Sequence, residues 1–114
     1  PLTDDTRGLF DRARLALMRP GASLVNLARG AHVVETDLLE ALNAGRLAHA
    51  VLDVFDHEPL PATHVFWFHP QVTVWPHAAA QTDLRSAAAV VAANVEAVRR
   101  GAAAAHLVDR SRGY

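Results

Sequence analysis

The sequence predicts an α/β fold in which helices flank a parallel sheet. Short apolar runs of the kind found in buried strands alternate along the chain with segments of helical periodicity. This alternation is typical of right-handed βαβ units, whose strands are parallel. In addition, a distinct polar side chain follows each apolar run, and open parallel sheets bind ligands beyond the carboxyl ends of their strands.

The first helix is expected from about Thr6 to Met18, before Pro20 and Gly21, which would end it. One face of this helix would carry Leu9, Phe10, Ala13 and Leu17. The apolar run from Ser23 to Ala28 then predicts the first strand.

A second helix is expected to begin at Thr36, a residue that can cap a helix N-terminus, and to end before Gly45. Its first turn contains Asp37 and Glu40, which suit the positive end of the helix dipole, and its core face would consist of Leu38, Leu39 and Leu42. The second strand is predicted from Ala48 to Val54.

The second half of the chain is expected to hold a loop, a strand and a long helix. A Pro-rich and aromatic-rich loop runs from His57 to Pro70, and residues 72–75 form an apolar strand that Pro76 ends. The final helix is predicted from about Asp83 to Arg100. Its apolar face would consist of Leu84, Ala88, Val91, Val95 and Val98.

Composition excludes several classes of function. The chain has 114 residues, 51% of them hydrophobic, and a net charge of −1, which gives no electrostatic reason to bind nucleic acid or an anionic membrane. Cysteine is absent, so disulfides and thiol catalysis are excluded. No apolar run approaches ~20 residues and no signal peptide is evident, so we expect a cytoplasmic location.

Three chemically different groups follow the three predicted strands: Arg29, Glu58 and His77. A guanidinium can bind a substrate carboxylate through two hydrogen bonds, and a carboxylate can orient an imidazole. The imidazole can exchange a proton with a substrate oxygen near neutral pH. Together they predict a site for redox chemistry on a 2-oxo or 2-hydroxy acid. Taken singly, each has a plainer reading as a surface Arg, a solvated loop Glu or a His at a strand end.

The segments around these groups resemble those of the D-isomer-specific 2-hydroxyacid dehydrogenases, and most of all the bacterial glyoxylate/hydroxypyruvate reductase branch. The resemblance rests on Asn-Leu-Ala-Arg-Gly at 26–30, Leu-Asp-Val-Phe-x-x-Glu-Pro at 52–59 and Pro-His at 76–77. Pro-Leu-Thr at 1–3 and Phe-Trp-Phe-His-Pro at 66–70 add to it. One departure is Trp75, where the family usually has Thr or Ser.

The resemblance implies roles for individual residues. Arg29 would bind the substrate carboxylate, His77 would act as the acid/base and Glu58 would pair with His77. The cofactor would be NAD(H) or NADP(H), touched on its nicotinamide side by Pro1, Thr3, Ala28, Asp53 and Ala79. Asp53 would contact the nicotinamide carboxamide.

The dinucleotide fingerprint G-x-G-x-x-G is absent. The glycines stand at 8, 21, 30, 45, 101 and 113, so no two are two positions apart. By the resemblance, residues 1–82 would form the C-terminal half of a Rossmann-like NAD(P)-binding catalytic domain, and residues 83–114 a return helix and tail packing toward a missing substrate domain. The expected partner is a small 2-oxo or 2-hydroxy acid, with a homodimer left open.

Two other interpretations stay open at this point. The chain could be a truncated, catalytically silent piece or an interaction module of the same fold, because it lacks the fingerprint and a three-stranded sheet has two open edges. A metal site is the weaker idea, since His64 and His69 are five residues apart in a Pro-containing loop and fit no common zinc spacing.

Overall fold

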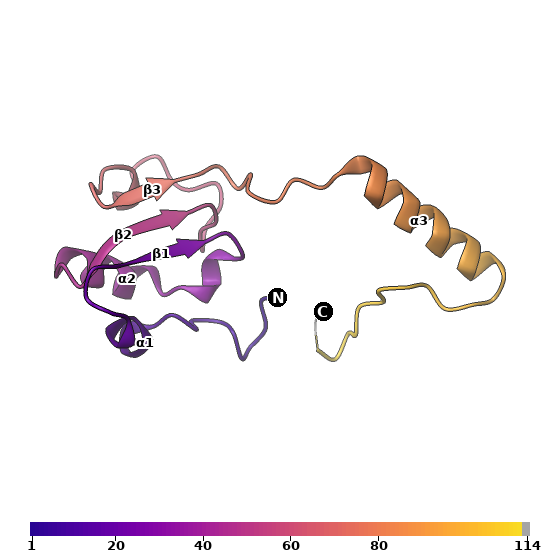
Figure 1. The fold of residues 1–114 in the computed structure, drawn as a ribbon, viewed down its shortest axis with the longest axis horizontal. Helices are drawn as coiled ribbons and strands as arrows, with labels where there is room; N and C mark the ends of the chain where they lie inside the picture. Colours follow the sequence, from indigo (N-terminus) through magenta and orange to yellow (C-terminus); the bar gives the residue numbers. More distant parts are fainter. Residues whose placement is uncertain (113–114) are drawn as a thin grey trace. The chain divides into compact units, whose positions relative to one another are not determined.

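A computed structural model of the chain describes residues 1–112 and divides into two compact units. The first unit spans Pro1–Ala79 and holds the sheet, and the second begins at Ala80. The elements follow in the order α1, β1, α2, β2, β3 and α3, with short 3₁₀ helices η1 (Gly30–His32) and η2 (Val65–Trp67) in two of the loops (Figure 1).

The sheet has three parallel strands in the order β1-β2-β3, and Figure 1 shows the three arrows side by side and pointing the same way. β1 is Ala22–Asn26, β2 is Leu47–Leu52 and β3 is Val72–Val74. In register, Asn26 faces Leu52 and Leu52 faces Val74. The carboxyl ends of all three strands therefore lie together at one edge of the sheet, as the alternating sequence pattern predicts.

The hydrophobic core forms where α2 (Glu35–Asn43) packs on β2 and α1 (Arg12–Leu17) packs on α2. Its buried members come from α1, β1, α2, β2 and η2 and from the loops at Val33 and Phe55: Leu15, Leu24, Val33, Leu38, Leu42, Leu47, Ala50, Leu52, Phe55 and Phe66. The prediction that Leu38 and Leu42 face the core is confirmed, and Leu39 is half-buried against it.

The first helix is much shorter than the sequence predicts, so the expected span from Thr6 to Met18 is wrong. Residues 4–8 form a turn in which Gly8 has a φ of 62°, and Phe10 then pairs with Val33 in an isolated parallel bridge, so a turn and an extended residue stand where a helix was expected. The helix starts only after Asp11, whose side chain accepts a hydrogen bond from the Arg14 N–H. The core residue of this helix is consequently Leu15 rather than Leu17.

Helix α2 begins earlier than predicted. Val34 occupies its N-cap without a side-chain hydrogen bond, and Thr36 lies inside the first turn, so the expected Thr36 cap is wrong. Its end agrees with the prediction, because Gly45 follows the last turn with a φ of 67°, a conformation that glycine adopts at low cost. Strands β1 and β2 each stop two residues before the predicted ends at Ala28 and Val54.

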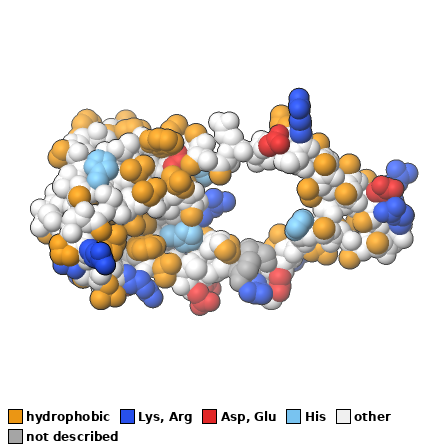
Figure 2. All heavy atoms as spheres, viewed as in Figure 1, with side chains coloured by type: hydrophobic (Ala, Val, Ile, Leu, Met, Phe, Trp, Pro, Cys, Tyr) orange, Lys and Arg blue, Asp and Glu red, His pale blue; other side chains and the backbone are white. Residues whose placement is uncertain are grey.

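The second unit consists of α3 (Leu84–Arg99) and the segment that follows it. Asp83 caps the helix by accepting a hydrogen bond from Arg85 N–H, as the predicted start implies. Asn94 fixes the following segment through two hydrogen bonds with the backbone of Ala105. No residue of α3 is buried, and hydrophobic side chains gather on its surface (Figure 2). Val91, Val95 and Val98 are exposed.

A search of the helices in residues 1–112 finds none that combines the length and the apolarity needed to cross a membrane.

Candidate active site

Arg29 lies in a tight turn directly after β1, and the side chain of Asn26 closes that turn. The Asn26 amide accepts a hydrogen bond from Ala28 N–H at 3.1 Å and donates one to the Arg29 carbonyl at 2.9 Å. Asn26 is buried, so both bonds are shielded from water. The Arg29 guanidinium is exposed and donates to the Ala28 carbonyl at 2.7 Å. None of the ion pairs among residues 1–112 includes Arg29.

Glu58 lies in the loop after β2, where its two carboxylate oxygens have different partners. One oxygen, Oε1, accepts a hydrogen bond from the Phe55 N–H at 2.9 Å, which fixes the carboxylate within its own loop. The other, Oε2, lies 2.7 Å from Nδ1 of His77. The Glu58 side chain therefore links the loop after β2 to the segment after β3.

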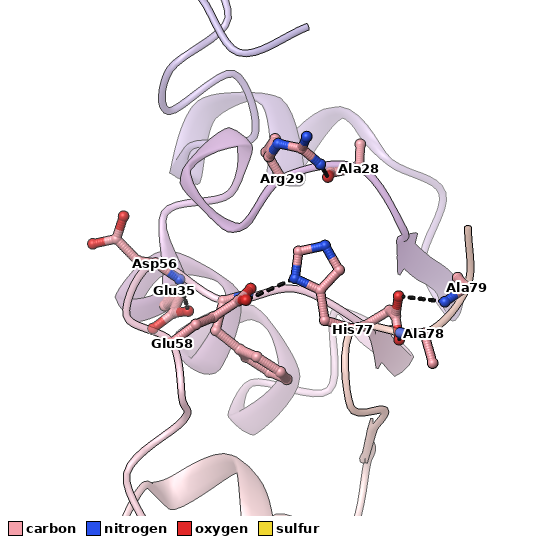
Figure 3. A network of polar contacts seen from close by, with 10 residues as sticks. Ala28, Arg29, Glu35, Asp56, Glu58, His77, Ala78 and Ala79 are labelled. Atoms are coloured by element: carbon pink, nitrogen blue, oxygen red, sulfur yellow. Dashed lines mark hydrogen bonds and ion pairs between the residues drawn. The ribbon is translucent and has the colours of Figure 1, made fainter. Parts of the chain in front are cut away.

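His77 follows β3 and has an unusual backbone conformation. The last hydrogen bond between this segment and β2 runs from the Trp75 N–H to the Leu52 carbonyl at 2.8 Å, and Pro76 follows. At His77 the φ angle is 55°, in the left-handed region that residues with a Cβ seldom adopt. In Figure 3 the ring points Nδ1 at Glu58, while its other nitrogen lies on the side of the ring nearer Arg29.

The charge on Glu58 determines which nitrogen of His77 carries the hydrogen. The hydrogen bond from His77 and the one from the Phe55 N–H lower the pKa of Glu58 below its ordinary value of 4.5, against a smaller opposing effect of burial. An ionised carboxylate can only accept hydrogen bonds, so Nδ1 donates to Glu58. The Nε2 atom is then the one that remains for a ligand.

Asp53 stands directly after β2 and is the most deeply buried charged residue of the site, with 1% of its surface exposed. Its oxygens accept hydrogen bonds from Ala78 N–H and from Ala79 N–H, both at 2.9 Å. Burial alone would raise the pKa of Asp53, but these bonds and the positive charge that His77 can carry outweigh burial and lower the pKa. Figure 3 labels Ala78 and Ala79, the two residues just past His77 whose N–H groups bind this carboxylate.

The loops that carry Arg29 and Glu58 touch each other at Gly30. A Cβ atom at position 30 would lie 1.9 Å from the Phe55 carbonyl carbon and 2.4 Å from the Asp56 nitrogen. Only glycine permits this approach of one backbone to another. Glu35 adds a second link by accepting a hydrogen bond from Asp56 N–H at 3.0 Å.

A hollow of about 470 Å³ lies beside the Glu58–His77 pair. Its walls are largely apolar and include Phe55, Leu60, Trp67 and Trp75, and both indoles are about half exposed. The Trp67 indole N–H is held by the Pro61 carbonyl at 2.9 Å. Trp75, the residue that departs from the family pattern, therefore forms part of the wall next to His77.

The remaining residues that the resemblance marks for cofactor contact lie near the start of the chain and after β1. The Pro1 carbonyl accepts a hydrogen bond from the Thr6 hydroxyl at 3.0 Å and lies 3.3 Å from His32 Nε2, while the Thr3 N–H donates to the same hydroxyl at 2.8 Å. His32 and Ala28 both line a hollow of about 400 Å³ along β1. Pro1 and Ala28 are thus close to the same hollow, and Ala79 lies beyond β3.

His64 and His69, the two histidines considered as metal ligands, each have a partner within the protein. His64 accepts a hydrogen bond from Phe66 N–H through Nδ1 and faces Glu35 at 3.6 Å, and His69 Nε2 lies 3.2 Å from the amide oxygen of Asn43. Within the described residues, no three His, Asp or Glu side chains are grouped as metal ligands would be.

Two supporting residues, Asn26 and Glu35, were not assigned a role from the sequence, and the close backbone approach at Gly30 was not expected either. The sequence did contain an indication for Asn26, because a polar residue at the end of an apolar run must find hydrogen-bond partners when it is buried. The close approach at Gly30 and the reach of Glu35 join segments more than 20 residues apart in the chain. No local pattern could have indicated them.

The fold and these contacts define the class of protein. It has an open parallel sheet with Rossmann-like topology, and its polar groups lie beyond the carboxyl ends of the strands. Residues 1–79 match the model of the family described as D-isomer specific 2-hydroxyacid dehydrogenase, NAD binding domain. The chain belongs to that family, and the family resemblance of its motifs is confirmed.

Known proteins of the reductase branch are similar over the whole chain. Glyoxylate/hydroxypyruvate reductase A of Serratia proteamaculans is 51% identical over 114 residues, and that of Yersinia enterocolitica is 46% identical. In both cases the chain spans 36% of the relative's length.

Solved structures agree with the fold. A 2-hydroxyacid dehydrogenase of Xanthobacter autotrophicus in complex with NADPH superposes with a TM-score of 0.94 at 42% identity, and covers all of this chain with 47% of its own. The NADPH-dependent glyoxylate/hydroxypyruvate reductase of Sinorhizobium meliloti, solved with NADP and sulfate, gives a TM-score of 0.91 at 43% identity. It also covers the whole chain, which matches 38% of its length.

Proposed function

We propose that this chain supplies the catalytic groups of an NAD(P)-dependent 2-hydroxyacid dehydrogenase that reduces a small 2-oxo acid such as glyoxylate or hydroxypyruvate. The observation that carries the proposal is the 2.7 Å contact between Glu58 Oε2 and His77 Nδ1 at the same sheet edge as an unpaired Arg29. The names of the relatives favour the same reaction.

Each group has one task in this reaction. Arg29 binds the substrate carboxylate, because its guanidinium has no carboxylate partner among the described residues and can make two parallel hydrogen bonds. His77 donates the Nε2 proton to the substrate carbonyl oxygen as that oxygen gains negative charge. Glu58 holds the Nδ1 hydrogen and stabilises the charged imidazole that exists before this transfer.

The residues at the strand ends fit a nicotinamide cofactor. Ala28 and Ala79 have small side chains that allow a planar ring to approach the backbone, and Pro1 lies near the hollow that Ala28 lines. Thr3 stands beside Pro1, and the Asp53 carboxylate binds the backbone of Ala78 and Ala79 after β3. Each Asp53 oxygen already accepts a bond, so a contact to the carboxamide would use its second lone pair. When bound, NAD(P)H supplies the hydride that reduces the carbonyl carbon.

The domain assignment is part of the proposal. Residues 1–82 would form the C-terminal half of the cofactor-binding catalytic domain, while residues 83–114 would return toward a substrate domain. The exposed valines of α3 support this assignment, because a helix with an apolar stripe is stable when that stripe is covered. The substrate domain would then supply the other side of the substrate site.

A second candidate is that the isolated chain is catalytically silent and serves only as a structural or interaction module. The missing G-x-G-x-x-G and the 36% share of the relatives' length favour it as a description of this chain alone.

One experiment separates the two candidates. Glyoxylate-dependent oxidation of NADPH and NADH is measured for the purified chain, and for a chimaera in which it replaces the matching residues of the Serratia proteamaculans reductase. Turnover by the chimaera alone supports encoded catalysis that needs the rest of the protein. Turnover by both would overturn the silent module, and a well-folded, inactive chimaera would overturn the proposed function.

A further inference from the structure

The backbone of His77 is held in a conformation that its own residue type disfavours. A φ of 55° brings the Cβ of a non-glycine residue close to its own backbone, so the surroundings must hold the residue there. Glu58 binds the ring and not the backbone. The contact that fixes the backbone must therefore lie elsewhere.

The buried carboxylate of Asp53 makes that contact. It accepts hydrogen bonds from two successive backbone groups, the Ala78 N–H and the Ala79 N–H, each at 2.9 Å. Successive N–H groups that converge on one side of a turn form a concave site for an anion. Here the anion belongs to the protein itself, because Asp53 stands at the end of β2 and is 1% exposed.

We propose that Asp53 is a positioning residue that anchors the turn after β3 and thereby holds His77 in its left-handed conformation. Without the Asp53 carboxylate, the Ala78 and Ala79 N–H groups would lose the acceptor that holds them together, and the turn would relax. Relaxation at His77 would swing the ring away from Glu58 Oε2. The consequence for proton transfer rests on the proposed function, whereas the anchoring itself does not.

The anchor also explains why a carboxylate, and not an amide, stands at position 53. Asparagine has the same shape but offers one acceptor oxygen and one donor nitrogen. Its nitrogen would face either Ala78 N–H or Ala79 N–H, donor against donor. Asp53→Asn therefore removes one bond and adds a repulsion without opening a cavity.

The anchoring is tested by a stability cycle on the chain, using His77→Gly and His77→Ala in the presence of Asp53 and of Asp53→Asn. Glycine tolerates the left-handed conformation, whereas alanine is strained by it. With Asp53 present, the unfolding equilibrium constant of His77→Gly should therefore be smaller than that of His77→Ala by about fivefold or more. The effect of glycine on the unfolded chain is the same in both backgrounds and cancels. With Asp53→Asn we expect this glycine preference to shrink by most of that factor. An unchanged preference would overturn the proposal.

A second measurement keeps the test decisive if Asp53→Asn unfolds the isolated chain. In the chimaera, Asp53→Asn is expected to lower kcat at least tenfold with a smaller change in KM for glyoxylate, and Asp53→Glu, which keeps both acceptors, to recover part of the loss. The control Asp56→Asn, an exposed residue of the same loop, should leave both constants unchanged. Equal kcat for Asp53→Asn and Asp56→Asn would contradict the anchor. An inactive parent chimaera would instead count against the proposed function, and the stability cycle would still decide on the anchor.

Discussion

His77 is positioned by two carboxylates, those of Glu58 and Asp53. The imidazole is reached by Glu58 from one side, and the backbone next to it is bound by Asp53. Each carboxylate has a lowered pKa because it accepts hydrogen bonds that favour its charged form. The sequence was sufficient to single out both residues of the pair, because each stands beyond a strand in a recognisable motif. The engagement of Asp53 with the backbone could not be predicted, since it depends on the turn geometry at His77.

At this scale, Glu58→Gln should change how stability depends on pH. The pKa of Glu58 is lower in the folded protein than its ordinary value of 4.5, so its contribution is fully present above that pH and is lost as the pH falls through the folded value. The variant removes this contribution. Its free energy of unfolding, measured by urea titration from neutral pH down to about pH 3, should fall less steeply in acid than that of the parent. If the free energy of unfolding falls equally steeply in acid for the variant and the parent, the contact with His77 does not stabilise the fold.

Arg29→Gln should weaken substrate binding more than proton transfer. The variant replaces the charge-assisted pair to the substrate carboxylate by the weaker bonding of a neutral amide, and a net loss of about 1.5–3 kcal/mol raises KM for glyoxylate on the order of tenfold to a hundredfold. Steady-state kinetics of the chimaera measure this effect. Arg19→Gln is the matched control, because Arg19 is also exposed but lies at the opposite end of β1. Equal KM values for the two variants would remove Arg29 from the carboxylate site.

At the scale of elements, the sheet and α3 could be predicted well and the first helix could not. Strong apolar runs located the strands within two residues, and Asp83 marked the start of α3. The segment before Asp11 has helical periodicity, yet Phe10 pairs with Val33 and draws it into an extended path. Thr36 is a good capping residue in isolation, but the helix starts two residues earlier, at Val34, whose N–H donates to the Phe10 carbonyl. Tertiary contacts thus decided what propensity left open.

The contact at Gly30 gives a prediction for the two loops it joins. A Cβ in Gly30→Ala would lie 1.9 Å from the Phe55 backbone, so one loop must move. We expect a loss of about 3 kcal/mol or more in the free energy of unfolding, at the upper end of overpacking effects. Gly45→Ala is the control, because its Cβ would meet nothing within 4 Å and it costs only the strain of a positive φ, about 1–2 kcal/mol.

Thermal or urea unfolding of the two glycine variants makes the comparison. If Gly30→Ala costs no more than Gly45→Ala, the loops are not locked together at that point. In the chimaera, displacement of the Phe55 segment should also reduce kcat, because the Phe55 N–H holds Glu58.

For the molecule as a whole, the chain carries the proposed acid/base pair but not the fingerprint that binds pyrophosphate. Such a fingerprint binds phosphates at a helix N-terminus through the backbone N–H groups there. The chain spans about a third of its relatives' length. Which phosphate or ribose the cofactor carries could not be predicted, because none of the residues here would touch that end.

The isolated chain should consequently bind NADPH on the order of a hundredfold more weakly than the chimaera, the equivalent of losing two charge-assisted bonds. Isothermal titration of both proteins with NADPH and NADH, with light scattering to establish that each is folded and not aggregated, gives the comparison. Equal affinities would mean that the nicotinamide side alone determines binding.

We propose that His77 moves the proton in a 2-oxo acid reduction. The kcat for glyoxylate reduction by the chimaera carrying His77→Asn tests this role. The control is His57→Asn, which alters an exposed histidine one residue before Glu58 and outside the proposed proton path. We predict a loss on the order of a hundredfold or more for His77→Asn, as expected for removal of a general acid, and a nearly unchanged rate for His57→Asn. A His77→Asn enzyme that keeps the kcat of the control would contradict the assignment of His77 as the acid/base.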